Sequence, residues 1–190
     1  MARIEMTPEA PEDLAVAALF EGIRARGVAV PNLYRVLGAS PDMLKAWIDF
    51  AWALRLEAKT PRGLRELSIM RGAQLSGVAY EWAHHRPMAL KAGVDEAKLA
   101  ALDHWRESDF YSEEERAVLQ MTDEITAGSG AAEATMARLS ALFTPEGVVE
   151  LTLTASFYVC VSRLLTSLDV DVEPDCAADA AAFEADRKRG

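Results

Sequence analysis

Three side chains in the first half of the chain have types and spacings suited to proton transfer. Glu81 and His85 stand four residues apart, one helical turn, which places them on the same face of a helix. A carboxylate beside an imidazole can fix the ring's tautomer and raise its basicity, so the pair is a candidate general acid or base. Glu66 shares an earlier apolar helical face with Ile69 and Met70, where a carboxylate requires a partner or a raised pKa. We therefore expect any catalysis to centre on Glu66, Glu81 and His85.

The neighbours of this pair indicate a pocket. Val78 and Met88 fall on the face of Glu81 and His85, and the hydroxyl of Tyr80 could reach inward, so we expect Val78, Tyr80 and Met88 to line a substrate pocket. His84 points about 100° away around the helix and is expected at the surface. A buried Glu–His pair can equally be a structural hydrogen bond, and the residues alone leave both interpretations open.

The charge of the chain excludes some partners. Its 190 residues carry a formal net charge of −10, which repels a phosphate backbone and anionic lipid. The one basic cluster, Arg187-Lys188-Arg189, is at the extreme end and is expected to be a solvated tail. The N-terminus has no apolar signal core, and no stretch approaches the roughly 20 uninterrupted apolar residues of a membrane span. We expect a cytoplasmic protein that binds a small molecule rather than nucleic acid or membrane.

The two cysteines do not form a redox or zinc motif. Cys160 and Cys176 are far apart, with no CxxC spacing. Two such thiols indicate a reducing compartment and predict neither a disulfide nor a structural zinc site. Cys160 lies in an apolar run and is expected to be a small buried hydrophobic residue.

Helix signals recur along the whole chain and predict an all-α protein. A hydroxyl side chain precedes a first-turn proline at Ser40-Pro41, Thr60-Pro61 and Thr144-Pro145. Ser112 and Glu115 are spaced as a capping box. No segment alternates with period two beside a hairpin turn, so strands are not predicted. The expected helices, about seven or eight in number, cover 8–26, 41–58, 61–76, 78–92, 95–104, 113–127, 131–142 and 145–167.

No linker divides these helices, so we expect a single-domain helical bundle over residues 1–190. The run from Val148 to Leu168 is apolar nearly all round, as in a central helix buried on several sides. The last residues, 174–190, are expected to form a tail or a short terminal helix.

A series of short motifs resembles the core of the carboxymuconolactone decarboxylase superfamily, which also contains alkylhydroperoxidase D. The motifs are Arg65-Glu66-Leu67, Tyr80-Glu81-Trp82-Ala83-His84-His85 (a YEWxxH motif), Ala89 and Gly93, with Pro31-Asn32-Leu33, Ser40-Pro41, residues 143–150 and Tyr158 at the flanks. The resemblance covers roughly residues 30–173. It implies an alkylhydroperoxidase D-like helical fold, protomers assembled into trimers or hexamers, and an active site near a protomer interface.

The resemblance also identifies a cysteine-less branch. Peroxidases of this superfamily carry a glutamate, a CxxC pair and a histidine; these positions correspond here to Glu66, to Val78 and Glu81, and to His85, so both cysteines are missing. A disulfide-forming thiol peroxidase needs both thiols. The decarboxylases have a glutamate four residues before the matching histidine, as Glu81 stands here, and a further histidine where this chain has Tyr80.

Four classes of function follow from these observations. The first is a lyase or isomerase, free of cofactor and metal, that acts on a small unsaturated or lactone carboxylic acid, with Glu66, Glu81 and His85 as its acid–base residues. In this reading Glu81 orients His85. The second is a peroxidase or peroxiredoxin-type antioxidant protein, which the missing CxxC disfavours. The third is a non-catalytic oligomer that binds a small molecule, and the fourth is a metal site formed by two carboxylates and an imidazole.

Overall fold

The computed structural model describes residues 2–188, and within them it contains ten α-helices, one short 3-10 helix and no strand. The predicted all-α class is confirmed, with more helices than the seven or eight expected. The helices are α1 (Leu14–Arg24), α2 (Asn32–Leu37), α3 (Pro41–Leu56), α4 (Arg62–Ser76), α5 (Ala79–Lys91), α6 (Glu96–Ala100), η1 (Leu102–His104), α7 (Glu113–Ala127), α8 (Glu133–Leu142), α9 (Pro145–Leu168) and α10 (Ala177–Arg187).

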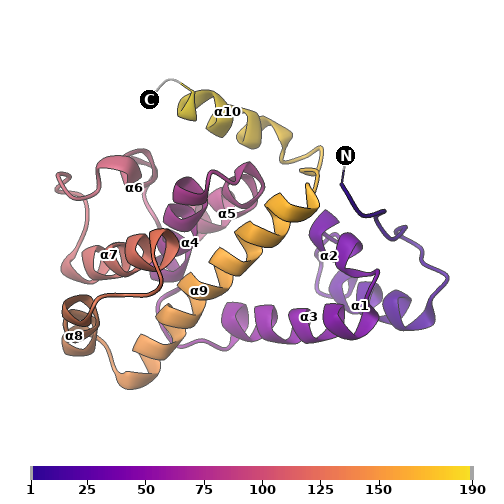
Figure 1. Ribbon diagram of the computed structural model, residues 1–190, viewed down its shortest axis with the longest axis horizontal. Helices are drawn as coiled ribbons and strands as arrows, with labels where there is room; N and C mark the ends of the chain where they lie inside the picture. Colours follow the sequence, from indigo (N-terminus) through magenta and orange to yellow (C-terminus); the bar gives the residue numbers. More distant parts are fainter. Residues whose placement is uncertain (1, 189–190) are drawn as a thin grey trace.

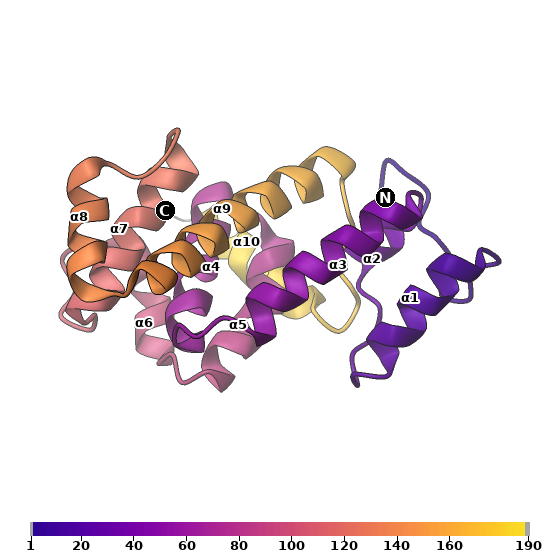
Figure 2. The same cartoon turned by 90° about the horizontal axis from the view of Figure 1, so that it is seen from below.

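Helix α4 lies at the centre of the arrangement. It packs against α5, α7 and α9, while α10 covers the outer side of α5 (Figure 1). Helices α1 and α2 pack on α3 at one end of the molecule, and α7 and α8 form the other end (Figure 2). The long helix α9 crosses between these two ends and contacts α3, α4, α7 and α8. The pair of helices α4 and α5 is therefore packed between α7 and α9, which contact α4, and α10, which contacts α5.

Two of the four predicted capping hydroxyls, Ser112 and Thr144, fix helix ends, whereas Ser40 makes no side-chain cap hydrogen bond and Thr60 precedes Pro61, which is itself the N-cap of α4. Ser112 and Glu115 form the expected capping box at the start of α7. Thr144 accepts a hydrogen bond from the Gly147 N–H at the start of α9, where Pro145 is the first residue. Gly77 ends α4 with φ +68°, a left-handed conformation that favours glycine. The turn at Gly77 brings α5 back alongside α4, and this hairpin places Glu66 beside His85.

Four segments of the chain differ from the predicted helices. Helix α1 begins at Leu14 instead of residue 8, because Asp13 accepts hydrogen bonds from Ala15 and Val16 and so caps it there. Helix α2 was not predicted; it has six residues and no side-chain cap. The segment expected as one helix over 95–104 divides into α6 and η1. Residues 177–187 form a helix, whose Phe183 stacks on Trp82 of α5.

Helix α9 is less buried than its composition predicted. One face packs inward, but Val149 and Leu153 are exposed, with 56% and 41% of their surface accessible. Among residues 2–188 it is the one helix long and apolar enough to cross a membrane by length and composition alone. A core helix that packs against four others in a globular fold can have the same length and composition.

Candidate active site

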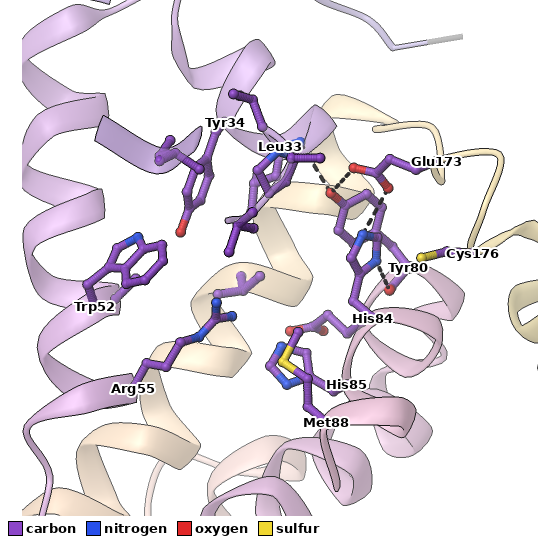
Figure 3. Close-up of a pocket in the computed structure, with 18 of the residues that line it drawn as sticks. Leu33, Tyr34, Trp52, Arg55, Tyr80, His84, His85, Met88, Glu173 and Cys176 are labelled. Atoms are coloured by element: carbon purple, nitrogen blue, oxygen red, sulfur yellow. Dashed lines mark hydrogen bonds and ion pairs between the residues drawn. The ribbon is translucent and has the colours of Figure 1, made fainter. Parts of the chain in front are cut away.

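A cavity of about 380 Å³ lies between α3, α5, α9 and the segments 27–34 and 173–176. Its size is that of a small-molecule site. Aromatic rings from α3 and α9 form much of its wall, and titratable side chains of α5 form another part (Figure 3). The residues that line it are Ile23, Gly27, Val28, Ala29, Val30, Pro31, Leu33, Tyr34, Trp47, Ala51, Trp52, Arg55, Tyr80, Glu81, His84, His85, Met88, Phe157, Tyr158, Val161, Glu173, Asp175 and Cys176.

Glu66 of α4 is fully buried and is the partner of His85. Its Oε2 lies 2.8 Å from His85 Nδ1, and its Oε1 accepts a hydrogen bond from Arg62. Burial alone would raise the pKa of this carboxyl, but the charges and hydrogen bonds of His85 and Arg62 together lower the pKa below its usual value. Glu66 is therefore ionised at neutral pH, although no part of it lines the cavity.

His85 lines the cavity, and its ring packs edge-on against Tyr158 with 4.9 Å between the ring centres. Burial lowers the pKa of His85; Glu66 opposes this effect, and the positive charges of Arg55 and Arg62 add to it. The ring is therefore neutral at pH 7. Because an ionised carboxylate at Nδ1 requires that nitrogen to carry the proton, Nε2 holds a free lone pair and can accept a proton.

Glu81 does not orient His85, in contrast to the expectation from their spacing. Glu81 Oε2 accepts a hydrogen bond from Ser162 of α9, and Oε1 is buried without a partner. The four-residue spacing puts both side chains at the cavity, but Nδ1 of the imidazole is already bonded to Glu66. Burial raises the pKa of Glu81 to about 8, against a smaller lowering by the Ser162 hydrogen bond. Glu81 is consequently protonated at neutral pH and can donate a proton.

The three residues expected to line the pocket have different positions. Tyr80 and Met88 line the cavity. Val78 does not: it precedes α5 in an extended conformation, and its side chain is buried in the apolar cluster formed with α1, α3 and the end of α9. A residue at a helix N-cap is outside the helical repeat, so its helical face could not be used to place it.

His84 was expected at the surface, but it belongs to a second polar cluster and is only partly exposed. Its Nε2 lies 3.0 Å from Glu173 Oε2, and its ring stacks on Tyr80 at 4.2 Å. Glu173 Oε1 accepts a hydrogen bond from the Tyr80 hydroxyl, at 2.8 Å (Figure 3). It accepts a second from the Asn32 N–H, at 2.6 Å. The segment after α9 is thereby joined to α5, a contact that no local pattern indicates because 93 residues separate Tyr80 from Glu173.

The electrostatics of this second cluster favour an ion pair. Burial lowers the pKa of His84, but the hydrogen bond and charge of Glu173, the Tyr80 carbonyl and Asp175 outweigh it, so the pKa is raised. The pKa of Glu173 is lowered, because these same hydrogen bonds and the His84 charge outweigh its burial. Both partners therefore favour their charged forms.

Neither cysteine is paired. Cys160 was expected to be buried but is exposed on α9. Cys176 lines the cavity, and burial together with nearby Asp175 and Glu173 raises its pKa, so it favours the thiol. Within residues 2–188 no three His, Cys, Asp or Glu side chains converge as metal ligands; Glu66 and His85 form a pair, and Glu81 is bonded to Ser162.

Sequence comparison finds relatives that cover part of the chain. Residues 41–124, which include Glu66, Glu81 and His85, match the sequence model of the Carboxymuconolactone decarboxylase family. The uncharacterized protein YdfG of Bacillus subtilis (strain 168) is 33% identical over 87 residues. This match covers 46% of the chain and 58% of YdfG, less than two thirds of that relative's length.

Solved structures share the fold over more of the chain. A variant of the debrominase Bmp8 in complex with 2,3,4-tribromopyrrole has a TM-score of 0.75 at 22% identity, covering 93% of each chain. An uncharacterized peroxidase-related protein from Silicibacter sp. TM1040 reaches 0.78 at 16% identity, covering 92% of this chain and 93% of the other. An Agrobacterium tumefaciens protein of unknown function, described as a candidate AhpD antioxidant defence protein, reaches 0.64 at 25% identity, covering 71% and 93%.

Proposed function

The chain belongs to the carboxymuconolactone decarboxylase superfamily, with its alkylhydroperoxidase D-like fold, and from this premise we propose that it is a lyase or isomerase acting on a small unsaturated or lactone carboxylic acid. One observation carries the proposal. Two titratable groups line one cavity with pKa values shifted in opposite directions, so that His85 is neutral and Glu81 is protonated at pH 7. Such a pair supplies a base and an acid at the same pH.

His85 Nε2 is the base. It takes a proton from a carbon next to an unsaturated acid or lactone group, and the electron pair of the broken C–H bond moves into the conjugated system. The buried carboxylate of Glu66 stabilises the imidazolium that forms, as its 2.8 Å contact with Nδ1 allows.

Glu81 is the acid. Its proton passes to another carbon of the same system, which moves the double bond without any loss of atoms, and exchange with solvent restores both groups. In a decarboxylation, the C–C bond to the carboxylate breaks and CO₂ leaves. The electron pair that remains on carbon then takes the proton of Glu81, and water replaces that proton. Acid–base catalysis of this kind contributes about 10²- to 10⁴-fold.

The test is turnover of a panel of lactones and unsaturated carboxylic acids, with proton exchange in D₂O measured by NMR. His85→Gln is expected to lower kcat by about 10²- to 10⁴-fold, and Glu81→Gln to lower it by a similar factor. His104→Gln, the same substitution at an exposed histidine outside the cavity, is the matched control and should leave kcat unchanged. Full activity of a folded His85→Gln variant would rule the mechanism out.

A thiol-dependent activity is the second candidate, because one cysteine does line the cavity. It would use Cys176, not Cys160, since Cys176 lines the cavity and Cys160 does not. The raised pKa of its thiol disfavours the reactive thiolate. Hydroperoxide reduction lost in Cys176→Ser but retained in His85→Gln would support this candidate over the acid–base reaction.

We also propose that the protein is a cytoplasmic homo-oligomer, a trimer or hexamer. The support is the exposed apolar side of α9, with Val149 and Leu153, and the neighbouring exposed Phe50 of α3. Light scattering after gel filtration tests the assembly: a monomer at micromolar concentration would contradict it.

A further inference from the structure

The wall of the cavity formed by α3 contains a cation without a counter-ion. Arg55 is partly buried in the last turn of α3, and its guanidinium makes no hydrogen bond or ion pair with any residue in the described part of the chain. In Figure 3 the side chain points into the space between Trp52 and Tyr34 on one side and His85 and Met88 on the other. The neighbouring Arg62 and Arg65, in contrast, each donate hydrogen bonds within the protein.

Two further hydrogen-bond donors lie on the same wall. Trp52 Nε1 is buried, and its N–H lies toward the Tyr34 hydroxyl without forming a hydrogen bond of good geometry. The buried Tyr34 directs its hydroxyl toward the same space (Figure 3). A buried donor that is left unpaired costs free energy, so this group of polar atoms favours a ligand that brings acceptors.

The local charge also favours an anion. The guanidinium of Arg55 lies 5.4 Å from the centre of the Trp52 ring, and that of Arg26 lies 4.6 Å from the same ring. Arg26 is exposed and does not line the cavity, so Arg55 is the arginine of its wall, in a chain whose net charge is −10. Of the three acids that line the cavity, Glu173 is paired with His84, Glu81 is protonated, and Asp175 is exposed beside Cys176.

The rest of the cavity wall indicates which carbon skeleton the ligand has. The rings of Trp47, Phe157 and Tyr158 also line the cavity and contact one another in a row that ends at His85. Aromatic walls suit a flat π-system, and 380 Å³ holds a compound of one ring or a short conjugated chain. A guanidinium offers paired N–H groups in the plane of a carboxylate.

We propose that Arg55, together with Trp52 Nε1 and the Tyr34 hydroxyl, binds the carboxylate of a planar aromatic or conjugated acid whose carbon skeleton extends toward His85 and Glu81. The inference rests on the proposed function and names the group by which the substrate is held.

A carboxylate bound at Arg55 favours some of the possible reactions over others. When His85 removes a proton from a carbon conjugated with the bound carboxylate, the electron pair delocalises onto the carboxylate oxygens, where Arg55 stabilises the added charge. Glu81 then protonates a different carbon, and the carboxylate remains attached. Loss of the bound carboxylate as CO₂ would instead move charge away from Arg55, so the ion pair would stabilise the reactant more than the transition state. The site therefore favours a double-bond shift, or loss of a second carboxylate elsewhere on the substrate.

The test is isothermal titration calorimetry of trans-cinnamate and its neutral analogue cinnamamide against the full-length protein. Wild type should bind cinnamate at least about 10-fold more tightly than cinnamamide, because a hydrogen-bonded charge pair is worth about 10- to 100-fold. Arg55→Gln should weaken cinnamate binding by about 10- to 100-fold and leave cinnamamide binding nearly unchanged. Arg163→Gln, at an exposed arginine outside the cavity, is the matched control and should bind both as wild type does.

Two further variants keep the proposal falsifiable if Arg55→Gln does not fold. Trp52→Phe and Tyr34→Phe keep the bulk of the wall, remove one donor each, and should weaken cinnamate binding by about 3- to 10-fold. Equal affinity of wild type for the two compounds, no binding of cinnamate, or unchanged binding in the folded variants would overturn the site.

His85→Gln separates this inference from the proposed function. The variant should bind cinnamate as wild type does while losing turnover. If turnover survives in His85→Gln but Arg55→Gln loses binding, the acid–base mechanism fails and the carboxylate site stands. If His85→Gln loses turnover but Arg55→Gln binds normally, only the carboxylate site fails.

Discussion

The adjacent histidines of α5 offer a direct comparison, because each contacts a carboxylate and yet their pKa values move in opposite directions. His85 and Glu66 are buried, and the cations Arg55 and Arg62 share their surroundings. His84 and Glu173 keep 20% and 17% of their side-chain surface exposed, and the main neighbours that raise the pKa of His84 are Glu173, the Tyr80 carbonyl and Asp175. The carboxylate partner alone therefore does not fix the protonation of a histidine; the depth of burial and the nearby charges decide it.

The comparison predicts unequal costs of removing the two carboxylates. Glu66→Ala leaves His85 and Arg62 without a buried acceptor, so we expect the free energy of unfolding to fall by about 3–5 kcal/mol. Glu173→Ala removes a partly exposed partner, and we expect a loss of about 1–2 kcal/mol. Urea denaturation at pH 7 measures both. Equal losses would show that the two pairs have the same energetic weight and would contradict the comparison.

Glu81 extends the comparison to a carboxylate with no cationic partner. Its pKa is raised from 4.5 to about 8 by burial, so the folded state binds a proton that the unfolded state releases above pH 4.5. Wild-type stability should therefore decrease between about pH 4.5 and pH 8 through this group, by a few kcal/mol. Glu81→Gln, which keeps the neutral shape, should be free of this decrease and gain relative to wild type at pH 8. A difference between the two proteins that stays constant with pH would contradict the assignment.

The smallest expected effect is the difference in the pH dependence of stability between variants of His84 and His85. The raised pKa of His84 contributes stability that is fully present below its unfolded value of 6.5 and is lost as the pH rises through its folded pKa. The lowered pKa of His85 has the opposite sign and costs stability as the pH falls below 6.5. Thermal unfolding should thus show that the substitution His84→Gln lowers stability more at pH 5.5 than at pH 8, by about 1 kcal/mol. The substitution His85→Gln should lower stability less at pH 5.5 than at pH 8. The same slope for both variants would mean that their surroundings do not differ as described.

Local signals in the sequence were sufficient to predict most of the helices. Ser112 with Glu115 and Thr144 with Pro145 act within one turn, so their effect is readable from the chain. The hydrogen-bond partner of His85 could not be predicted from local spacing. Spacing on α5 suggested Glu81, whereas the contact with Glu66 joins residues 19 apart through the packing of α4 on α5.

The rest of the site depends on contacts between distant segments. Arg55 lies on the helical face that carries Trp47 and Ala51, so a close inspection of that face could have found it. Nothing near Glu173 indicated that it would meet His84, because their contact requires the chain to pass through α9 and return. The alternation of buried and exposed positions on α9 was hidden by its uniformly apolar composition.

The cavity takes the side chains of Glu81 and His85 and part of its aromatic wall from different parts of the chain. Glu81 and His85, with Glu66 behind His85, belong to one hairpin of helices inside the stretch 41–124, but Tyr34, Phe157 and Tyr158 come from before and after it. Substitutions in those outer segments can reshape the space for a ligand while Glu81 and His85 keep their separation along α5. Divergence within such a fold can therefore exchange one substrate for another and preserve the chemistry performed on it.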